Sequence, residues 1–252
     1  MKALFGLMSV VLLVVAAAPC WGDPVTITLK GTDNCVDAKI TSGDYNNWGG
    51  ASGVMYTKFD GTKKTLIAFP NVATLVPNGA DVTSATLQLY LHTSNNQVKV
   101  AIHQILVPWV EGTATVSGST DDGVTWYDPD GPANGDNDWP GDNGMLAGTD
   151  YASNYETEKV VTSAQDDKYV DFDLTDLVRR WDNGDATNYG VVLLLDQGYG
   201  EYYVFPSEHA STPKLVITYE AGAGDVPEPG TMLLVGTGVL AVLGYMRRRR
   251  MG

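Results

Sequence analysis

The chain has 252 residues, 30 acidic and 16 basic side chains, a formal net charge of −14 and two cysteines. This length allows one large domain or two small ones. The negative charge excludes a nucleic-acid-binding protein, because no basic surface is available to displace counterions from phosphate. Two cysteines are too few for a disulfide framework or a thiolate zinc site. A hydrophobic fraction of 44% is ordinary for a globular chain. Together with the negative charge, it indicates an acidic globular protein.

Residues 1–22 have the organisation of a secretory signal peptide. Lys2 precedes an apolar run over residues 3–18, and Gly22 offers a small residue at the exit. A basic start, a short apolar run and a small residue near the cleavage point define such a signal. A retained membrane anchor is the alternative, although Asp23-Pro24 interrupts the run. We expect export by the Sec machinery and cleavage near Gly22.

The C-terminal end carries a second sorting feature. An apolar segment of 17 residues, 230–246, follows the linker 221–229 and precedes the basic tail 247–252. At about 1.5 Å per residue this segment spans roughly 25 Å, near the lower limit for a bilayer. Arginines resist translocation, so we expect the tail in the cytoplasm and the preceding domain outside. The residues of this feature are Val226, Pro227, Glu228, Pro229, Arg247, Arg248, Arg249 and Arg250.

This arrangement resembles the PEP-CTERM sorting signal, in which a Pro-Glu-Pro motif, one apolar helix and a basic terminus occur in that order. The resemblance implies recognition by an exosortase in a Gram-negative bacterium, transient anchoring in the inner membrane and cleavage near the motif. It also implies association with extracellular polysaccharide. A simple C-terminal membrane anchor is the alternative. Without both ends, the chain has 11 basic and 30 acidic residues, a net charge of −19.

The sequence between residues 25 and 219 has the pattern of β-strands. Apolar and polar residues alternate in four segments, 26–29, 85–92, 98–105 and 169–174. Such alternation places one set of side chains in a core and the other in solvent. Further strand candidates are 65–69, 190–195, 202–205 and 215–219. Many short strands predict an all-β protein, a β-sandwich of the jelly-roll type over residues 23–220.

One segment follows a helical period instead. Its apolar positions are Leu174, Leu177, Val178 and Trp181. Their spacing places them on one face of a helix. Asp173 can cap the first turn, and Gly184 can end the helix. We expect a single two-turn helix that closes one end of the sandwich with Trp181 in the core.

Residues 117–158 form a long loop rich in Gly, Asp, Asn and Pro. Its aromatic residues favour packing against the sandwich: Trp126, Tyr127, Trp139, Tyr151 and Tyr155. Its carboxylates suit Ca²⁺, which prefers hard oxygen ligands; they are Asp121, Asp122, Asp128, Asp130, Asp136, Asp138 and Asp142, beside Asn143. A solvated acidic loop is the alternative. A second calcium candidate comprises Asp37, Asp44, Asn46 and Asn47.

The body of the chain also resembles the DNRLRE domain, a disaggregatase-related domain similar to carbohydrate-binding modules. The motifs that carry the resemblance include Lys64–Phe69, Val76–Tyr90, Pro108–Thr113, Asp173–Trp181 and Pro213–Leu215. The resemblance spans roughly residues 25–220 and implies a secreted jelly-roll β-sandwich. Some members of this family bind acidic polysaccharides such as alginate. The chain departs from the family at Lys64 and Ala68, where arginines are common.

Sugar binding by this chain would use aromatic rings and a basic cluster. The candidate stacking residues are Tyr45, Trp48, Tyr199, Tyr202 and Tyr203. The lysines that could contact a carboxylated sugar are Lys58, Lys63 and Lys64. For each aromatic ring, packing in the core or at its rim is the alternative.

Sequence signatures of catalysis are absent. The chain has three histidines and contains no nucleophile elbow, zincin motif or phosphate-binding loop. We therefore expect a non-enzymatic, exosortase-sorted protein of the cell surface or extracellular matrix that binds polysaccharide. A purely structural matrix protein without a specific glycan ligand, stabilised by calcium, is the alternative. Calcium is the one cofactor that the sequence leaves open.

Overall fold

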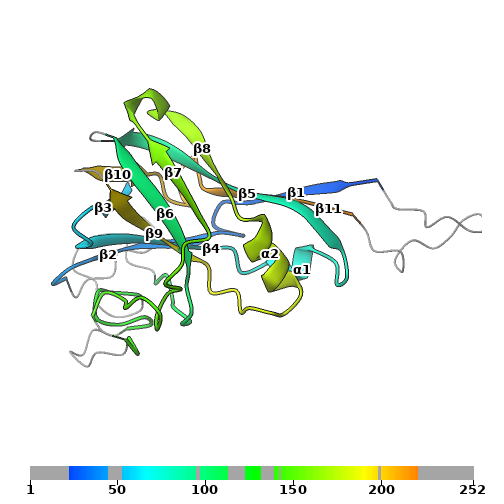
Figure 1. Ribbon diagram of the computed structural model, residues 1–252, viewed down its shortest axis with the longest axis horizontal. Helices are drawn as coiled ribbons and strands as arrows, with labels where there is room; N and C mark the ends of the chain where they lie inside the picture. Colours follow the sequence, from blue (N-terminus) through cyan, green and yellow to red (C-terminus); the bar gives the residue numbers. More distant parts are fainter. Residues whose placement is uncertain are drawn as a thin grey trace, which may run out of the picture. The chain divides into compact units, whose positions relative to one another are not determined.

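The described part of the chain forms two antiparallel β-sheets, whose strands are labelled in Figure 1. The computed structural model describes residues 23–44, 53–94, 97–112, 123–131, 139–141, 143–197 and 200–220. The predicted signal peptide, linker, apolar segment and basic tail lie outside these ranges. Among the described residues, no helix is long and apolar enough to cross a membrane.

Sheet A has six strands, with the order β1-β11-β5-β10-β3 and with β8 also paired to β5. They are β1 (Val25–Lys30), β3 (Met55–Lys58), β5 (Asp81–Ser94), β8 (Lys168–Asp173), β10 (Glu201–Val204) and β11 (Lys214–Glu220). β5 is 14 residues long. Its length lets it pair with β11 near its start and with β10 near its end, while β8 lies along its other edge.

Sheet B has five strands in the order β2-β4-β9-β6-β7. They are β2 (Val36–Thr41), β4 (Lys63–Ala68), β6 (Val98–Gln104), β7 (Thr157–Val161) and β9 (Val191–Gln197). β9 pairs with β4 on one side and with β6 on the other. Its apolar run therefore forms a central strand, as the sequence predicted.

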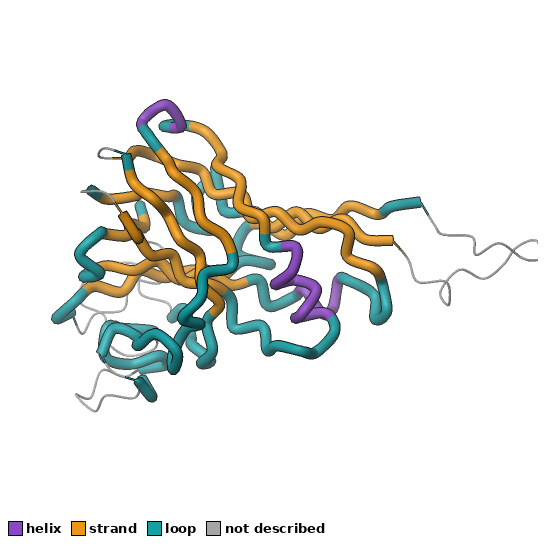
Figure 2. Tube along the Cα trace, in the orientation of Figure 1, coloured by secondary structure: helices purple, strands orange, loops and turns teal. Residues whose placement is uncertain are grey.

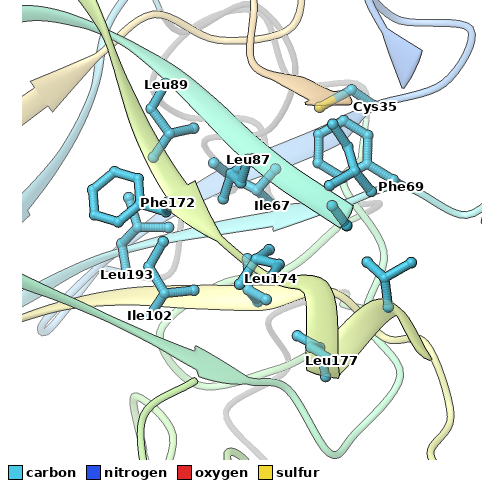
Figure 3. Packing of buried hydrophobic residues seen from close by; sticks show 14 of the residues in the cluster. Cys35, Ile67, Phe69, Leu87, Leu89, Ile102, Phe172, Leu174, Leu177 and Leu193 are labelled. Carbon is cyan, nitrogen blue, oxygen red and sulfur yellow. The ribbon is translucent and has the colours of Figure 1, made fainter. Parts of the chain in front are cut away.

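The main hydrophobic core lies between the sheets (Figure 3). Leu87 and Phe172 from sheet A pack in one cluster with Ile67, Ile102 and Leu193 from sheet B. Each of these side chains is at most 1% exposed. Full burial of one such side chain stabilises the fold by about 1.5–3 kcal/mol. The all-β sandwich predicted from the alternating pattern is confirmed.

Short helices connect the strands (Figure 2). α1 (Val72–Leu75) and the 3₁₀ turn η1 (Ser163–Gln165) are single turns, and α2 (Thr175–Asp182) is the helix predicted from the sequence. At its start, Asp173 Oδ1 accepts the backbone N–H of Thr175 at 2.9 Å. Trp181 is 7% exposed and belongs to the main core, which confirms its predicted packing role.

A second hydrophobic cluster covers the outer face of sheet B. It joins Ile40, Leu66 and Val192, which point away from the main core, to Trp139 and Met145 of the long loop. The described parts of the loop therefore pack on the sandwich, as its aromatic residues predicted. Tyr155 is the exception, because it is 50% exposed. The loop also ends earlier than predicted, since β7 begins at residue 157.

Candidate functional site

Four side chains from both sheets meet where β3 packs against β2 and β4. We call Lys39 of β2, Tyr56 of β3, Lys63 of β4 and Tyr203 of β10 the lysine–tyrosine cluster. Tyr56 and Tyr203 are direct partners in the register of β3 and β10. Lys39 of β2 and Lys63 of β4 lie on paired strands. In their register, Lys39 is opposite Thr65 and Lys63 is opposite Thr41. The cluster is thus assembled from four separate strands.

The aromatic rings and the ammonium groups of this cluster are in direct contact. The rings of Tyr56 and Tyr203 are stacked, with centroids 5.1 Å apart and an interplanar angle of 21°. Lys63 Nζ lies 4.1 Å from the Tyr56 centroid, and it donates a hydrogen bond of 2.6 Å to the Tyr56 hydroxyl. Lys39 Nζ lies 4.5 Å from the same centroid. Each such cation–π contact is worth about 0.5–2 kcal/mol.

The two lysines repel each other across this ring. Burial and, to a smaller extent, the charge of Lys63 lower the pKa of Lys39 to about 8, while Asp44 opposes this shift. Lys39 therefore still carries its charge at neutral pH. In a chain of net charge −14, the cluster concentrates positive charge that an anionic group would stabilise.

The predicted Lys58 lies beside the cluster but is neutralised. Its ammonium group is 2.9 Å from Asp60 Oδ2, and the two side chains are 41% and 45% exposed. Exposed ion pairs of this kind contribute little to stability. Nearby, the Tyr203 hydroxyl donates a short hydrogen bond to the Glu201 carboxylate. Lys58 is therefore a surface neighbour of the cluster with a carboxylate partner of its own.

Two of the predicted sugar-contacting residues are wrong. Lys64 follows Lys63 on β4 and points to the opposite face; it is 8% exposed. Its ammonium group donates to the carbonyls of Gly144 and Met145, so it holds the long loop on sheet B. Tyr202 is 0% exposed and belongs to the main core, where its ring cannot stack on a ligand. Among the predicted residues, Lys63 and Tyr203 are brought together.

The remaining predicted stacking residues, Tyr45, Trp48 and Tyr199, lie outside the described part of the chain. Sequence reasoning missed Lys39 and Tyr56. Tyr56 alternates with Lys58 in a four-residue strand, which is too short for a clear periodic signal. Lys39 stands between two buried apolar residues of β2. Neither position can be linked to Lys63 without the strand register.

The calcium candidates are only partly described. Asp128 is 1% exposed, and its Oδ1 accepts the backbone N–H groups of Asp130 at 3.0 Å and Gly131 at 2.8 Å. This carboxylate thus stabilises a turn. Five loop aspartates lie outside the described residues: Asp121, Asp122, Asp136, Asp138 and Asp142. Within the described ranges, no three His, Cys, Asp or Glu side chains form a metal-binding group.

A buried carboxylate group joins three segments near the start of β2. Asp37 is 1% exposed, and its Oδ2 accepts the Ser207 N–H at 2.6 Å. The Asp37 N–H donates to Glu111 Oε1 at 2.7 Å. Burial raises the pKa of Asp37 well above its ordinary value, and Glu208 and Glu111 add to this shift. Burial also raises the pKa of Glu111 to about 7. Asp37 and Glu111 thus connect these three segments, and burial favours the protonated form of both carboxyl groups.

A separate cleft of about 370 Å³ opens beside the start of α2. Its lining is polar and includes Glu156, Asp173, Asp176 and Arg179, and it shares no residue with the lysine–tyrosine cluster. Arg179 Nη1 lies 3.3 Å from Asp176 Oδ1 and its Nε donates to the Val82 carbonyl at 2.7 Å. The Arg179 guanidinium is already engaged, and the carboxylates in the lining outnumber it. The cleft is therefore poorly suited to an anionic ligand.

Comparison with known proteins identifies the C-terminal end of the chain. The PEP-CTERM protein-sorting motif matches residues 225–250, which include the Pro-Glu-Pro residues, the apolar segment and the four arginines. None of the curated proteins compared with the chain matches it. The predicted PEP-CTERM resemblance is confirmed, and the motif implies an exported protein that an exosortase targets to the cell surface. The match does not extend into residues 23–220, so the resemblance to the DNRLRE domain stays a prediction.

Proposed function

We propose that the protein is a non-enzymatic module of the bacterial cell surface or extracellular matrix that binds carboxylated polysaccharide. Its folded part, a DNRLRE-like sandwich, holds the ligand at the lysine–tyrosine cluster. The observation that carries the proposal is the convergence of Lys39 and Lys63 on the ring of Tyr56, at 4.5 and 4.1 Å. The protein is exported by the Sec machinery, anchored transiently by residues 230–246, and released from this anchor by an exosortase in a Gram-negative bacterium.

A uronic acid unit has the chemistry that this cluster accommodates. Its carboxylate relieves the repulsion between the two ammonium groups, and charge-assisted hydrogen bonds are stronger than neutral ones. The carbon–hydrogen face of its sugar ring packs against the tyrosine rings through apolar contact. Carboxylates elsewhere on the protein repel a polyanion, so contact concentrates at this cluster. Charge screening at physiological salt acts over about 8 Å, which makes such binding salt-dependent.

A matched pair of lysine variants tests this proposal. The exported protein, Lys63→Gln and Lys58→Gln are run through native gels that contain a soluble polyuronate or a neutral glucan. Both substitutions remove one positive charge from neighbouring strands, but Lys58 is already paired with Asp60. We expect Lys63→Gln to weaken polyuronate retardation about tenfold, equivalent to about 1.4 kcal/mol, and Lys58→Gln to change it less than twofold.

Two results would overturn the proposal. Equal losses in the two variants would mean that net charge, rather than the cluster, governs retention. A folded wild-type protein that migrates unretarded through every polyuronate gel would leave a structural matrix component as the better description. Circular dichroism melting of each variant distinguishes a lost contact from a lost fold.

A further inference from the structure

A second group of ring side chains lies on the outer face of sheet A. Along β5, Leu89 and Leu91 are buried in the main core, whereas Tyr90 and His92 point outward. Tyr169 of β8 is the direct register partner of Tyr90. We call the following residues the aromatic row: Tyr90, His92, Tyr169, Phe205 and His209.

The rings of this row are in continuous contact. Tyr90 meets Tyr169 edge to face at 5.1 Å, and it meets Phe205 at 5.7 Å with a tilt of 32°. Phe205 in turn lies 4.9 Å from His92 and 3.7 Å from His209, whose ring is parallel to it within 9°. Since His209 is exposed and Phe205 half-buried, the imidazole lies on the solvent side of this stack.

Hydrogen bonds fix the row in place. The Tyr169 hydroxyl donates to the Thr212 carbonyl at 3.3 Å. His209 Nδ1 accepts the Ser211 N–H at 3.0 Å, so Nε2 carries the proton when the ring is neutral and can act as a donor. A surface that is ordered before binding loses less conformational entropy when a ligand arrives. Of the five rings, Tyr90, Tyr169 and Phe205 are half-buried and His92 and His209 are exposed, so part of the row is accessible to a ligand.

The charges around the row indicate a neutral ligand. Asp167 Oδ1 lies 4.0 Å from His92 Nδ1 at one end. Asp171, which accepts a 3.0 Å hydrogen bond from Gln88 Nε2, lies farther along the same face. Lys214 has its Nζ 3.8 Å from the Tyr169 centroid. Lys159 also donates its ammonium group to the Asp171 backbone carbonyl at 2.8 Å. Asp167 and Asp171 are thus offset by Lys214 and Lys159, so this face has no excess of positive charge that would attract a polyanion.

We propose that the aromatic row binds neutral polysaccharide, as a contact separate from the lysine–tyrosine cluster. Sugar rings offer an apolar face for Tyr90 and His209, and hydroxyl groups for the adjacent amide and carboxylate of Gln88 and Asp171. A protein partner fits less well, because the cores of protein–protein interfaces are depleted of charged residues. Charged residues lie beside the rings of this row. The inference rests on ring contacts and surface charge alone, so it does not depend on uronate binding.

Native gels that contain a neutral polymer, such as hydroxyethylcellulose, glucomannan or dextran, test this inference with the exported protein. We expect at least one of these polymers to retard the wild type. His209→Ala, which removes an exposed ring, should weaken that retardation about fivefold, and Tyr90→Ala about tenfold. Tyr155→Ala removes another half-exposed ring outside the row and serves as the matched control. Melting curves show whether Tyr90→Ala remains folded, and His209→Ala keeps the test valid if it does not.

The outcomes separate the two sites. Lys63→Gln should leave retention by the neutral polymer unchanged, even if uronate binding is absent in every variant. The inference is refuted if no neutral polymer retards the folded wild type, or if His209→Ala and Tyr155→Ala behave alike. Sedimentation that shows a dimer disrupted by His209→Ala would also refute it, since a second copy would then cover the row.

Discussion

The buried joint between Glu111 and β2 makes a quantitative prediction about pH. The pKa of Glu111 is raised from 4.5 to about 7, mainly by burial. The folded state therefore binds more protons than the unfolded state between these values. This group stabilises the fold fully below pH 4.5, and its contribution is lost as the pH rises through about 7. Stability should fall with rising pH across this window.

Replacing Glu111 by Gln should remove that part of the pH dependence while keeping an oxygen that can accept the Asp37 N–H. One pKa unit corresponds to about 1.4 kcal/mol, so the full shift from 4.5 to about 7 sets an upper limit of roughly 3–4 kcal/mol. Glu111 retains contact with solvent, and screening reduces the expected effect to about 1–2 kcal/mol. The variant should gain this much stability relative to wild type between pH 5 and pH 8.

Urea unfolding followed by tryptophan fluorescence at these two pH values measures the difference. The neighbouring acids Asp37 and Glu208 are present in both proteins, so the difference between variant and wild type comes from the loss of the Glu111 carboxylate and of its effect on Asp37. Asp167→Asn removes an exposed carboxylate and controls for the change in net charge. If the stability difference between Glu111→Gln and wild type is the same at pH 5 and pH 8, the burial argument for this joint is wrong.

Three further substitutions test the packing. Trp181→Ala should lower the free energy of unfolding by about 3–5 kcal/mol, because it leaves a cavity in the main core; chemical denaturation measures this, and a loss below 1 kcal/mol would contradict core packing. Gly190→Ala should lower the melting temperature, since Gly190 has φ +85° and a Cβ there would collide with the Ile67 carbonyl; an unchanged melting temperature would refute the clash. Lys64→Met should speed proteolysis within residues 143–150, because it removes the donors to the Gly144 and Met145 carbonyls; equal cleavage rates in variant and wild type would show that Lys64 does not hold the loop.

Strands with a clear alternating or continuously apolar pattern were predictable from the sequence, and strands that lack such a pattern were not. β5 alternates clearly because one face is solvated. β2 escaped prediction because both of its faces are covered. The long loop covers Ala38 and Ile40, while Asp37 and Lys39 on the other face are buried against Ser207 and Tyr56. β3 has only four residues, and β7 is an edge strand with exposed charged and apolar positions. In these strands the order of apolar and polar residues follows from the position of the strand in the fold, so the local sequence alone does not reveal it.

The candidate site shows the same limit. Consecutive lysines 63 and 64 look equivalent in the sequence, yet the pleat of β4 sends the first to the cluster and the second under the loop. Lys39 approaches Tyr56 because β3 packs beside β2 and β4, a contact between sheets that local sequence does not encode. By contrast, the sorting motif is contiguous in the chain, so residues 225–250 could be identified directly.

The central claim is that the chain works outside the cytosol after an exosortase has removed its C-terminal end. Intact mass spectrometry of the protein recovered from the cell surface or matrix tests it most directly. The account predicts a species that lacks residues 1–22 and ends near Pro227–Pro229, without the arginines of the tail. A surface species that still carries Arg247–Arg250, or a full-length chain confined to the cytosol, would contradict it.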